Sequence, residues 1–498
     1  MNIRTSLGAG VCVAALLTGQ TAWADLSASD VWNSWKENLT LYGEDGVTIG
    51  TEEVSGDSVI VSDVVLSMTD AYTTLTATID QITFTENGDG TVSIEMPDSI
   101  PLEMDDAGTL ISITATQAGA EIIASGDPDA MNMAVSADQY VITVDRIVEY
   151  DEELPADIRF TLNGVEGSYT INDGDLRDLG YALSVASADL LVDVQEPGSD
   201  NGGLISGRME SLTANALIAL PKDADFDNPE TFLGKGFSVE GGYGLGSSTY
   251  IFDIKDGSDT VAGTASTGSI DVGLLLNEDR VSYDVASSDV NVQLQAAELP
   301  FPVSITLDSY GVGFNVPLAS SDTPQPFSAR FDLTELAVND ELWMMADAGG
   351  QLPHDPITAR IDISGEARLF YDVMDPEQAE QLAMADVPGE IHSVSLDELT
   401  ISAVGASIDG AGAFTFDNSD LQTIPGVPRP EGQITVNIAG ANALIDTLVD
   451  MGLVPADQAG MARMMMGMFA RTTGDDQLTS TIEINEQGHI LANGQRIQ

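Results

Sequence analysis

Apolar and polar residues alternate along most of the chain, and residues typical of turns interrupt the alternation at short intervals. Leu75, Ala77 and Ile79 give one such apolar face, because successive side chains of a strand point to opposite sides. Asn87-Gly88-Asp89-Gly90 joins two alternating segments with residues that tolerate the positive φ of a tight hairpin. The pattern predicts a mainly β protein, with an extended, curved antiparallel sheet of repeated β-meander units over residues 44–430.

Part of this strand pattern recurs along the chain. Residues 185–195 (VASADLLVDVQ) match residues 285–295 (VASSDVNVQLQ), and residues 135–144 begin with a shorter copy. Spacings of about 50 and 100 residues indicate a unit of a few strands, which is stabilised by stacking on the next copy. Chance recurrence in a chain rich in Val, Ala, Ser and Asp is the alternative.

Helical periodicity is confined to a few segments. Over residues 25–43, Trp32 and Trp35 recur at helical spacing behind a Ser27–Asp30 capping box, which predicts a short amphipathic helix. Residues 431–498 contain two apolar stripes separated by a proline and predict a helical hairpin flanked by strands. Two shorter helices are expected to start at Asn339 and at Asp375-Pro376.

Residues 1–24 have the organisation of a secretory signal peptide. Arg4 supplies the positive charge, a short apolar run follows, and Ala22-Trp23-Ala24 offers the small residues of a cleavage site. The apolar run is about half of the roughly 20 residues that a membrane-spanning helix needs, and no later segment reaches that length. We therefore expect a periplasmic or secreted protein. Its only cysteine, Cys12, lies in the removed segment, so the core must stabilise the fold without disulfides.

The chain carries 17 basic and 80 acidic side chains, a formal net charge of -63. This charge excludes nucleic acid as a partner, because a basic face is needed to displace counterions from phosphates. The hydrophobic fraction of 43% is near the globular average, which argues against disorder. Salt or divalent cations would screen the self-repulsion of the folded state.

Recognisable catalytic chemistry is absent from the sequence. His354, His392 and His489 are not spaced as a zinc pair, and no Gly-x-Ser-x-Gly motif is present. Neighbouring carboxylates do not identify a catalytic acid–base pair here, because among 80 acidic residues two will often be neighbours by chance. We expect a protein that is not an enzyme and has no catalytic or cofactor-binding residue, although a scattered Ser-His-Asp triad stays open.

One acidic turn resembles part of a calcium loop. Asp223, Asp225 and Asp227 alternate like the first three ligands of such a loop. Asn228 follows where glycine is preferred, and Gly234 stands where a bidentate Glu belongs. The segment is either an incomplete calcium site or a solvated acidic turn.

Two other features could contact an apolar ligand. Three glycines at alternate positions leave one strand face bare, which admits a second backbone or an apolar ligand: Gly242, Gly244 and Gly246. A methionine stripe at helical spacing either fills the core or offers a flexible apolar surface: Met461, Met464, Met465 and Met468.

Three segments carry a resemblance to a known family: residues 25–35, residues 342–365 and residues 488–494. Together they resemble an uncharacterised domain-of-unknown-function family of exported alphaproteobacterial proteins, over nearly the whole mature chain. The family implies no activity. Long alternating strands with a terminal helical element also resemble the envelope proteins of the AsmA and TamB type, whose β grooves are associated with lipids.

Two functional hypotheses follow. The first is a non-enzymatic exported envelope protein that binds a lipid or another apolar envelope component, or an envelope protein, on one sheet face. The alternative is an acidic, calcium-stabilised interaction or adhesion module.

Overall fold

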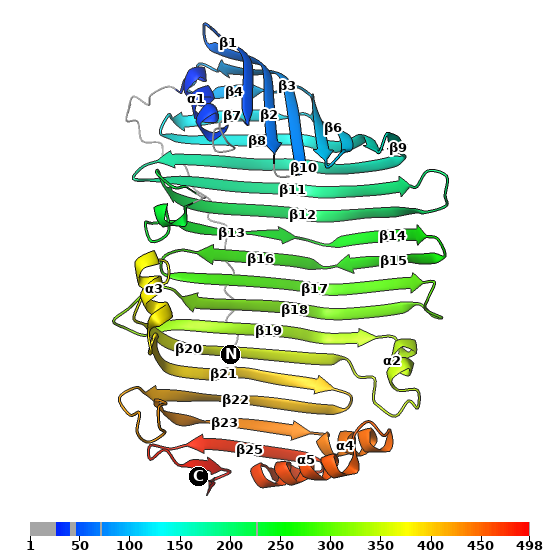
Figure 1. Ribbon diagram of the computed structural model, residues 1–498, viewed down its shortest axis with the longest axis vertical. Coiled ribbons are helices and arrows are strands. Elements are labelled where there is room, and N and C mark those ends of the chain that lie inside the picture. The colour runs from blue at the N-terminus through cyan, green and yellow to red at the C-terminus, as the bar shows by residue number, and fades with distance from the viewer. Residues whose placement is uncertain (1–25, 40–45, 70–71, 226–227, 498) are drawn as a thin grey trace.

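A single antiparallel sheet forms the body of the protein (Figure 1). The computed structural model describes residues 26–39, 46–69, 72–225 and 228–497. In these residues, 27 strands and five α-helices are present, and the strands stack along the long axis of the molecule. The predicted fold class is therefore confirmed. The proposed signal peptide lies outside the described residues.

The strands run down the sheet broadly in chain order, except within two groups, β4–β7 and β13–β16, where two short strands share each layer. The first are β1 (Val47–Ser55), β2 (Ser58–Thr69), β3 (Thr73–Glu86), β4 (Val92–Glu95), β5 (Ser99–Asp106), β6 (Thr109–Ala118), β7 (Glu121–Asp127), β8 (Ala130–Glu149) and β9 (Glu152–Leu154). The middle strands are β10 (Ala156–Asp173), β11 (Leu176–Gln195), β12 (Gly202–Pro221), β13 (Ser238–Leu245), β14 (Ser248–Asp256), β15 (Asp259–Thr267), β16 (Ser269–Leu276), β17 (Arg280–Ala296), β18 (Val303–Pro317) and β19 (Gln325–Val338). The last are β20 (Ile357–Leu369), β21 (Gly389–Ala403), β22 (Ala406–Asp417), β23 (Arg429–Ala439), β24 (Arg471–Gly474), β25 (Gln477–Ile484), β26 (Ile490–Ala492) and β27 (Gln495–Arg496).

A six-strand unit occurs twice in this sheet. In the first copy, the two halves of β3 pair with β4 and β5, these pair with β7 and β6, and both of those pair with the two halves of β8. In the second copy, β12, β13, β14, β16, β15 and β17 pair in the same order. The sequence copies that begin at Val135 and Val285 thus lie in equivalent strands, β8 and β17. The copy that begins at Val185 lies in β11, which is not the last strand of either unit.

An irregular line, here called the seam, crosses the middle of successive strands. Backbone pairing skips one position there, and several of the residues have a left-handed backbone, as at Gly164 (φ 60°), Ser211 (φ 54°) and Asp289 (φ 51°). The breaks between β13 and β14 and between β15 and β16 fall on the same line. A residue with positive φ interrupts the two-residue alternation, as in a β-bulge. Leu162 and Val165, three positions apart, therefore pack in one apolar cluster.

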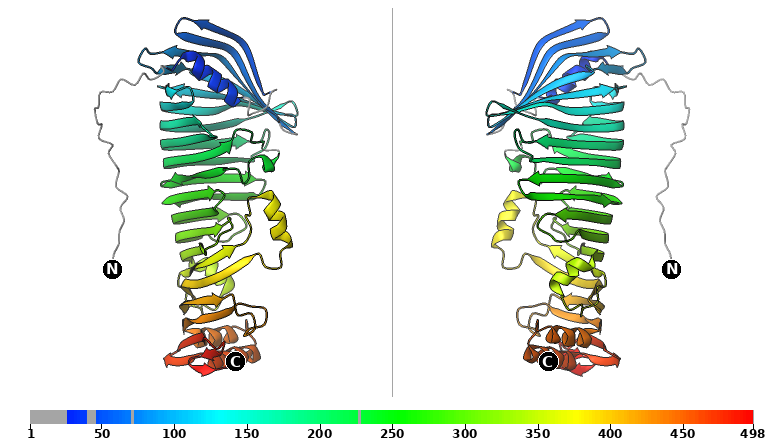
Figure 2. Two further views of the ribbon diagram at one scale, coloured as in Figure 1. Left: turned by 90° about the vertical axis from the view of Figure 1, so that its left-hand side faces the viewer. Right: turned by 90° about the vertical axis from the view of Figure 1, so that its right-hand side faces the viewer.

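The main core lies at the N-terminal end, beneath α1 (Ala28–Leu39). Ser27 and Asp30 cap this helix reciprocally: the Asp30 amide donates to the Ser27 hydroxyl (3.2 Å), and the Ser27 amide donates to the Asp30 carboxylate (3.1 Å). Trp32 is 1% exposed, and its ring lies 5.6 Å from that of Phe84 in β3. The curled strands β1–β3 arch over the helix (Figure 2), and the capping box predicted from the sequence is confirmed.

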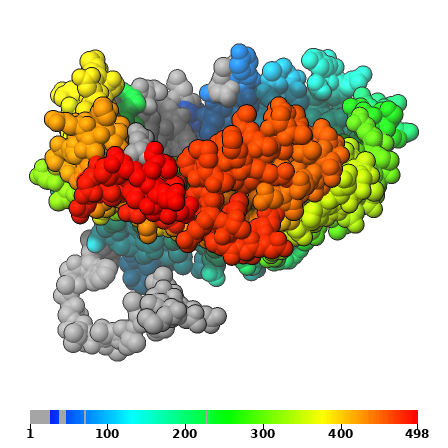
Figure 3. All heavy atoms as spheres, turned by 90° about the horizontal axis from the view of Figure 1, so that it is seen from below, coloured from blue at the N-terminus to red at the C-terminus, as the bar shows by residue number. Residues whose placement is uncertain are grey.

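The remaining helices lie at the rims and at the C-terminal end. They are α2 (Asp340–Ala346), α3 (Pro376–Met384), α4 (Ala441–Asp450) and α5 (Ala456–Phe469). The predicted starts at Asn339 and Asp375 are confirmed, and the Asp375 carboxylate accepts a hydrogen bond from the Glu377 amide (3.0 Å). Helices α4 and α5 form the predicted hairpin, which lies beside the last strands at the lower end of the molecule (Figure 3).

Candidate functional site

The two faces of the sheet differ sharply in chemistry. A row of cross-strand neighbours near the seam runs down one face, one residue from each layer: Gly167, Leu183, Ala214, Tyr243, Val272, Val285, Val312, Phe331, Ile361, Leu399, Gly410 and Val436. The adjacent row on the other face is Glu166, Ser184, Thr213, Gly244, Asp271, Ala286, Gly311, Asp332, Arg360, Thr400, Asp409 and Asn437. We call the first the apolar face and the second the polar face.

Most of the apolar face is uncovered below α1. Tyr243 is 55% exposed and Leu274 is 44% exposed, although both lie in the middle of the sheet. Further exposed residues of this face are Ile142, Tyr181, Leu183, Ile254, Val261, Tyr310, Phe314, Val316, Phe331, Ile391 and Ile401. Soluble monomers rarely expose a continuous apolar surface of this extent, and such a surface marks an interaction site.

Two hollows in the apolar face show where an apolar group could lie. One, of about 590 Å³, spans β8 to β12 and is lined by residues that include Tyr140, Leu162, Val165 and Tyr181. Burial raises the pKa of the Tyr140 hydroxyl, as expected where water is excluded. The other, of about 370 Å³, lies where strand ends meet a rim of the sheet, over Val192, Val194, Ile205 and Ile254. We take the apolar face and these hollows as the candidate site.

The polar face is held by charged and hydroxyl groups. Arg330 contacts Asp284 (2.6 Å), and Arg360 contacts Asp332 (2.9 Å). At the seam, the hydroxyls of Ser364 (2.5 Å) and Ser395 (2.6 Å) donate to the Asp397 carboxylate and lower its pKa. Charged and hydroxyl groups are costly to remove from water, so this face favours hydration.

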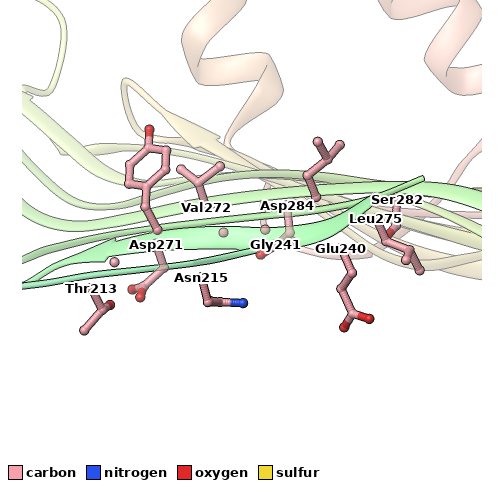
Figure 4. Close-up of a pocket in the computed structure, with 14 residues that line it drawn as sticks. Thr213, Asn215, Glu240, Gly241, Asp271, Val272, Leu275, Ser282 and Asp284 are labelled. Atoms are coloured by element: carbon pink, nitrogen blue, oxygen red, sulfur yellow. The ribbon is translucent and has the colours of Figure 1, made fainter. Parts of the chain in front are cut away.

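The glycine strip lies on the polar face. Gly242 and Gly244 are in β13, and Gly246 follows it. The hollow beside them has a volume of about 540 Å³. Of the residues that line it, the polar Thr213, Asn215 and Glu240 point to one side of the sheet, and the apolar Val272 points to the other (Figure 4). A Cβ at Gly246 would stand 2.7 Å from the Glu210 carbonyl oxygen, and one at Gly242 would meet the Val272 carbonyl. Close approach of neighbouring backbone thus explains Gly242 and Gly246, whereas a Cβ at Gly244 would meet the side chains of Thr213 and Asp271. The strip lies opposite the apolar face.

The methionine stripe is at the surface of α5. The exposed fractions of Met464 and Met465 are 62% and 53%, and those of Met461 and Met468 are 60% and 64%. Core filling is therefore the wrong interpretation of this stripe. It is a second exposed apolar surface, at the C-terminal end of the sheet.

The acidic turn lies between β12 and β13, at a rim. Asp225 forms a bridge with Asn228, and the Asp225 amide donates to the Thr231 hydroxyl (2.7 Å). Asp227 lies outside the described residues. Within the described ranges, no group of three or more His, Cys, Asp or Glu side chains is placed to hold a metal ion.

The three histidines lie in separate parts of the structure. His354 stacks on Trp343 with ring centroids 5.0 Å apart and contacts Asp340 (2.9 Å). His392 is in β21, and His489 is in the turn before β26. In the described residues, no hydrogen bond or ion pair joins any two of them, so they give no basis for a shared catalytic site.

The C-terminal half of the chain matches a known family. Residues 247–490 match the sequence model of a family described as "Uncharacterized protein conserved in bacteria (DUF2125)". This part of the chain belongs to DUF2125. The DUF2125 region runs from β14 to the start of β26. It therefore contains the lower part of the apolar face, the rim helices α2 and α3, and the methionine stripe. The glycine strip and the acidic turn precede it.

The matched region is shorter than we expected from the sequence, because the resemblance described above extended over nearly the whole mature chain. No curated protein and no solved structure matches the chain. In the part of the chain that the structure describes, no helix combines the length and apolar character needed to cross a membrane.

Proposed function

We propose that the protein is a non-catalytic, exported envelope protein that holds the acyl chains of lipids along its apolar face. One observation carries the proposal: from β10 to β23, the described positions of this face away from the strand ends bear no charged side chain. A face without charges offers an occupant dispersion contacts and release from water, and almost nothing else. Acyl chains need only these.

The dimensions of the face favour lipids over a small apolar ligand. Twelve strand layers at about 4.8 Å spacing make the face roughly 50 Å long. One leaflet of a bilayer has a hydrocarbon thickness of roughly 15 Å. Several chains can therefore lie side by side, and flexible chains follow a twisted surface without a rigid matching shape.

Helix α1 supports the proposal from within the molecule. Its residues Val31 and Trp32 pack in one cluster with apolar-face residues Met133, Ile171 and Leu179. The face thus accepts a long apolar occupant at its N-terminal end, where the helix closes it. Below α1 the same kind of surface is open, which leaves room for an occupant from outside the chain.

The test compares two leucines on opposite faces. The protein is purified from the envelope without detergent, and lipid in an organic extract is quantified by mass spectrometry. We expect bound lipid in the wild type and a severalfold loss in Leu274→Asp, because a carboxylate on the apolar face is costly to bury. Leu217→Asp is the control, since Leu217 is 59% exposed on the polar face of β12.

Lipid-free, folded wild-type protein would contradict the proposal, as would equal loss in the two leucine variants. The double variant Met464→Asp/Met465→Asp extends the same assay to α5. We expect lipid retention to fall while the fold is kept, because both side chains are exposed. Unchanged lipid content would remove α5 from the binding surface.

A further inference from the structure

We infer that the lipid on the apolar face has a headgroup without net negative charge, with zwitterionic phospholipid as the class. This inference rests on the proposed function and adds the identity of the headgroup. The acyl chains lie on the face, so the headgroups must lie where the face ends, at the hairpin turns that form the two rims. The charge of those rims therefore decides which headgroup is tolerated.

The rims are rich in carboxylates. Exposed acids at the turns and strand ends of one rim include Glu152, Glu196, Asp200, Asp256, Asp259 and Glu298. The opposite rim carries Asp173, Asp175, Glu278, Asp279, Asp372, Asp417 and Asp420. A phosphate or a carboxylate headgroup would meet negative charge on either side of the face.

Several basic residues at the rims are already paired with acids. Lys222 contacts Asp173 (3.2 Å), and Lys255 contacts Asp200 (3.5 Å). Arg429 lies among three acids, at 3.2 Å from Asp417, 3.2 Å from Asp420 and 3.5 Å from Glu431. An anionic headgroup would have to compete with these carboxylates for each cation.

The smaller hollow of the apolar face shows the arrangement at one point of the rim. Its floor is apolar, and Glu196, Lys255 and Asp256 stand at its edge. The Asn201 side-chain amide donates to Glu196 (2.6 Å), which fixes that carboxylate at the end of the strand. A lipid whose acyl chain lies in this hollow places its headgroup beside two carboxylates and one lysine. These charges suit a zwitterionic headgroup, which carries both an ammonium and a phosphate.

The test offers the protein two lipids that differ in headgroup charge. Vesicles of phosphatidylcholine or phosphatidylglycerol with identical acyl chains are mixed with the protein and removed by flotation, and lipid phosphate in the protein fraction is measured. At low ionic strength, we expect uptake of phosphatidylcholine to exceed that of phosphatidylglycerol by about tenfold, and the ratio to approach one near 0.5 M NaCl as the charges are screened.

A pair of charge-matched variants separates the rim from the net charge. Glu152→Lys/Asp259→Lys/Glu298→Lys changes exposed rim acids, whereas Glu166→Lys/Glu240→Lys/Asp271→Lys makes the same change of charge on the polar face. Melting curves establish that both are folded. We expect the rim variant to take up severalfold more phosphatidylglycerol, and the polar-face variant to change much less.

Each remaining outcome contradicts a separate claim. Equal uptake of the two lipids by the wild type at low ionic strength would overturn the headgroup inference and leave the proposed function standing. Equal gains in the two triple variants would overturn the assignment to the rims. Uptake of neither lipid by folded protein would overturn the proposed function itself.

Discussion

The seam shows how single residues shape this sheet. Asp289 has a φ of 51°, and its side chain leans over Gly268, between β15 and β16, where an added Cβ would stand 2.6 Å from its carboxylate. Gly50 and Asp63 repeat the arrangement near the N-terminus. Asp and Asn tolerate the left-handed region better than other residues with side chains, and β-branched residues tolerate it least. A small residue beside an Asp thus accommodates the irregular backbone.

This argument predicts a position-specific loss of stability. Asp289→Val should lower the free energy of unfolding by about 1–3 kcal/mol, because Val is strained at positive φ. Asp308, across the strand pair, is exposed and has no positive φ, so Asp308→Val should change stability by less than about 0.5 kcal/mol. Urea unfolding curves of both variants provide the measurement. Equal effects would show that loss of the charge, and not the backbone, is responsible.

The seam also explains what the sequence pattern left unresolved at this scale. Strand alternation predicted the sheet, but a simple two-residue period assigns Leu162 and Val165 to opposite faces. The structure places them on one face because Gly164 between them has a φ of 60°. The same three-residue spacing recurs at Leu307 and Tyr310 across the seam. Apolar pairs at this spacing within an alternating strand were the signal that could have located the seam and, with it, the two faces.

At the scale of elements, the helices were predictable where local chemistry marks their ends. The capping box of α1 and the Asp375-Pro376 start of α3 depend on residues adjacent in sequence. The start of α4 depends on a distant residue instead. Its N-cap is Gly440, and Asp476 from the turn before β25 accepts bonds from the amides of Asn442 (3.1 Å) and Ala443 (2.9 Å). No local pattern could show this contact.

Asp476 makes the attachment of α4 dependent on pH. Burial acts to raise the pKa of Asp476, but the bonds from Ala443 and Asn442 outweigh it, and the pKa is lowered. A carboxyl with a lowered pKa contributes stability above its unfolded pKa of about 3.9 and loses it as pH falls through the folded value. The α4–α5 hairpin should therefore loosen below about pH 4.

Hydrogen exchange of the α4 amides tests this anchor. Asp476→Gly suits the φ of 46° and removes the carboxylate, so amide exchange in α4 should accelerate about fivefold at pH 7, the equivalent of a cap worth about 1 kcal/mol. The difference from the wild type should shrink as the pH falls below about 3.9 and vanish once the pH lies below the lowered pKa of Asp476 in the folded protein. Asp475→Gly, one residue earlier, is the control. A similar acceleration in both variants would assign the effect to turn flexibility.

At the scale of the whole molecule, the sequence predicted an extended sheet and two candidate surfaces for an apolar ligand, the glycine strip and the methionine stripe, but it did not locate the larger apolar face. The glycine strip drew attention because the residue type is distinctive, yet it lies among Thr213, Asn215 and Glu240 on the polar face. The larger apolar face consists of ordinary Val, Leu, Ile and Phe positions. In a sequence, such positions look the same whether a second layer covers them or not. Coverage is a property of the assembled fold, and α1 covers only one end of it.

The net charge of -63 gives the last prediction at this scale. Self-repulsion among exposed carboxylates destabilises the folded chain, and divalent cations screen it. If screening is the whole effect, CaCl2 and MgCl2 should raise the Tm equally at equal ionic strength. A bound calcium would add stabilisation that depends on its dissociation constant and that magnesium, with its stricter geometry, would not match. We expect equal rises, because the acids of the described chain are spread over strands and turns instead of gathered around a point. A larger rise with calcium that disappears in Asp223→Asn/Asp225→Asn would favour the calcium-stabilised module and would make the acidic turn, rather than the apolar face, the first place to look for a ligand.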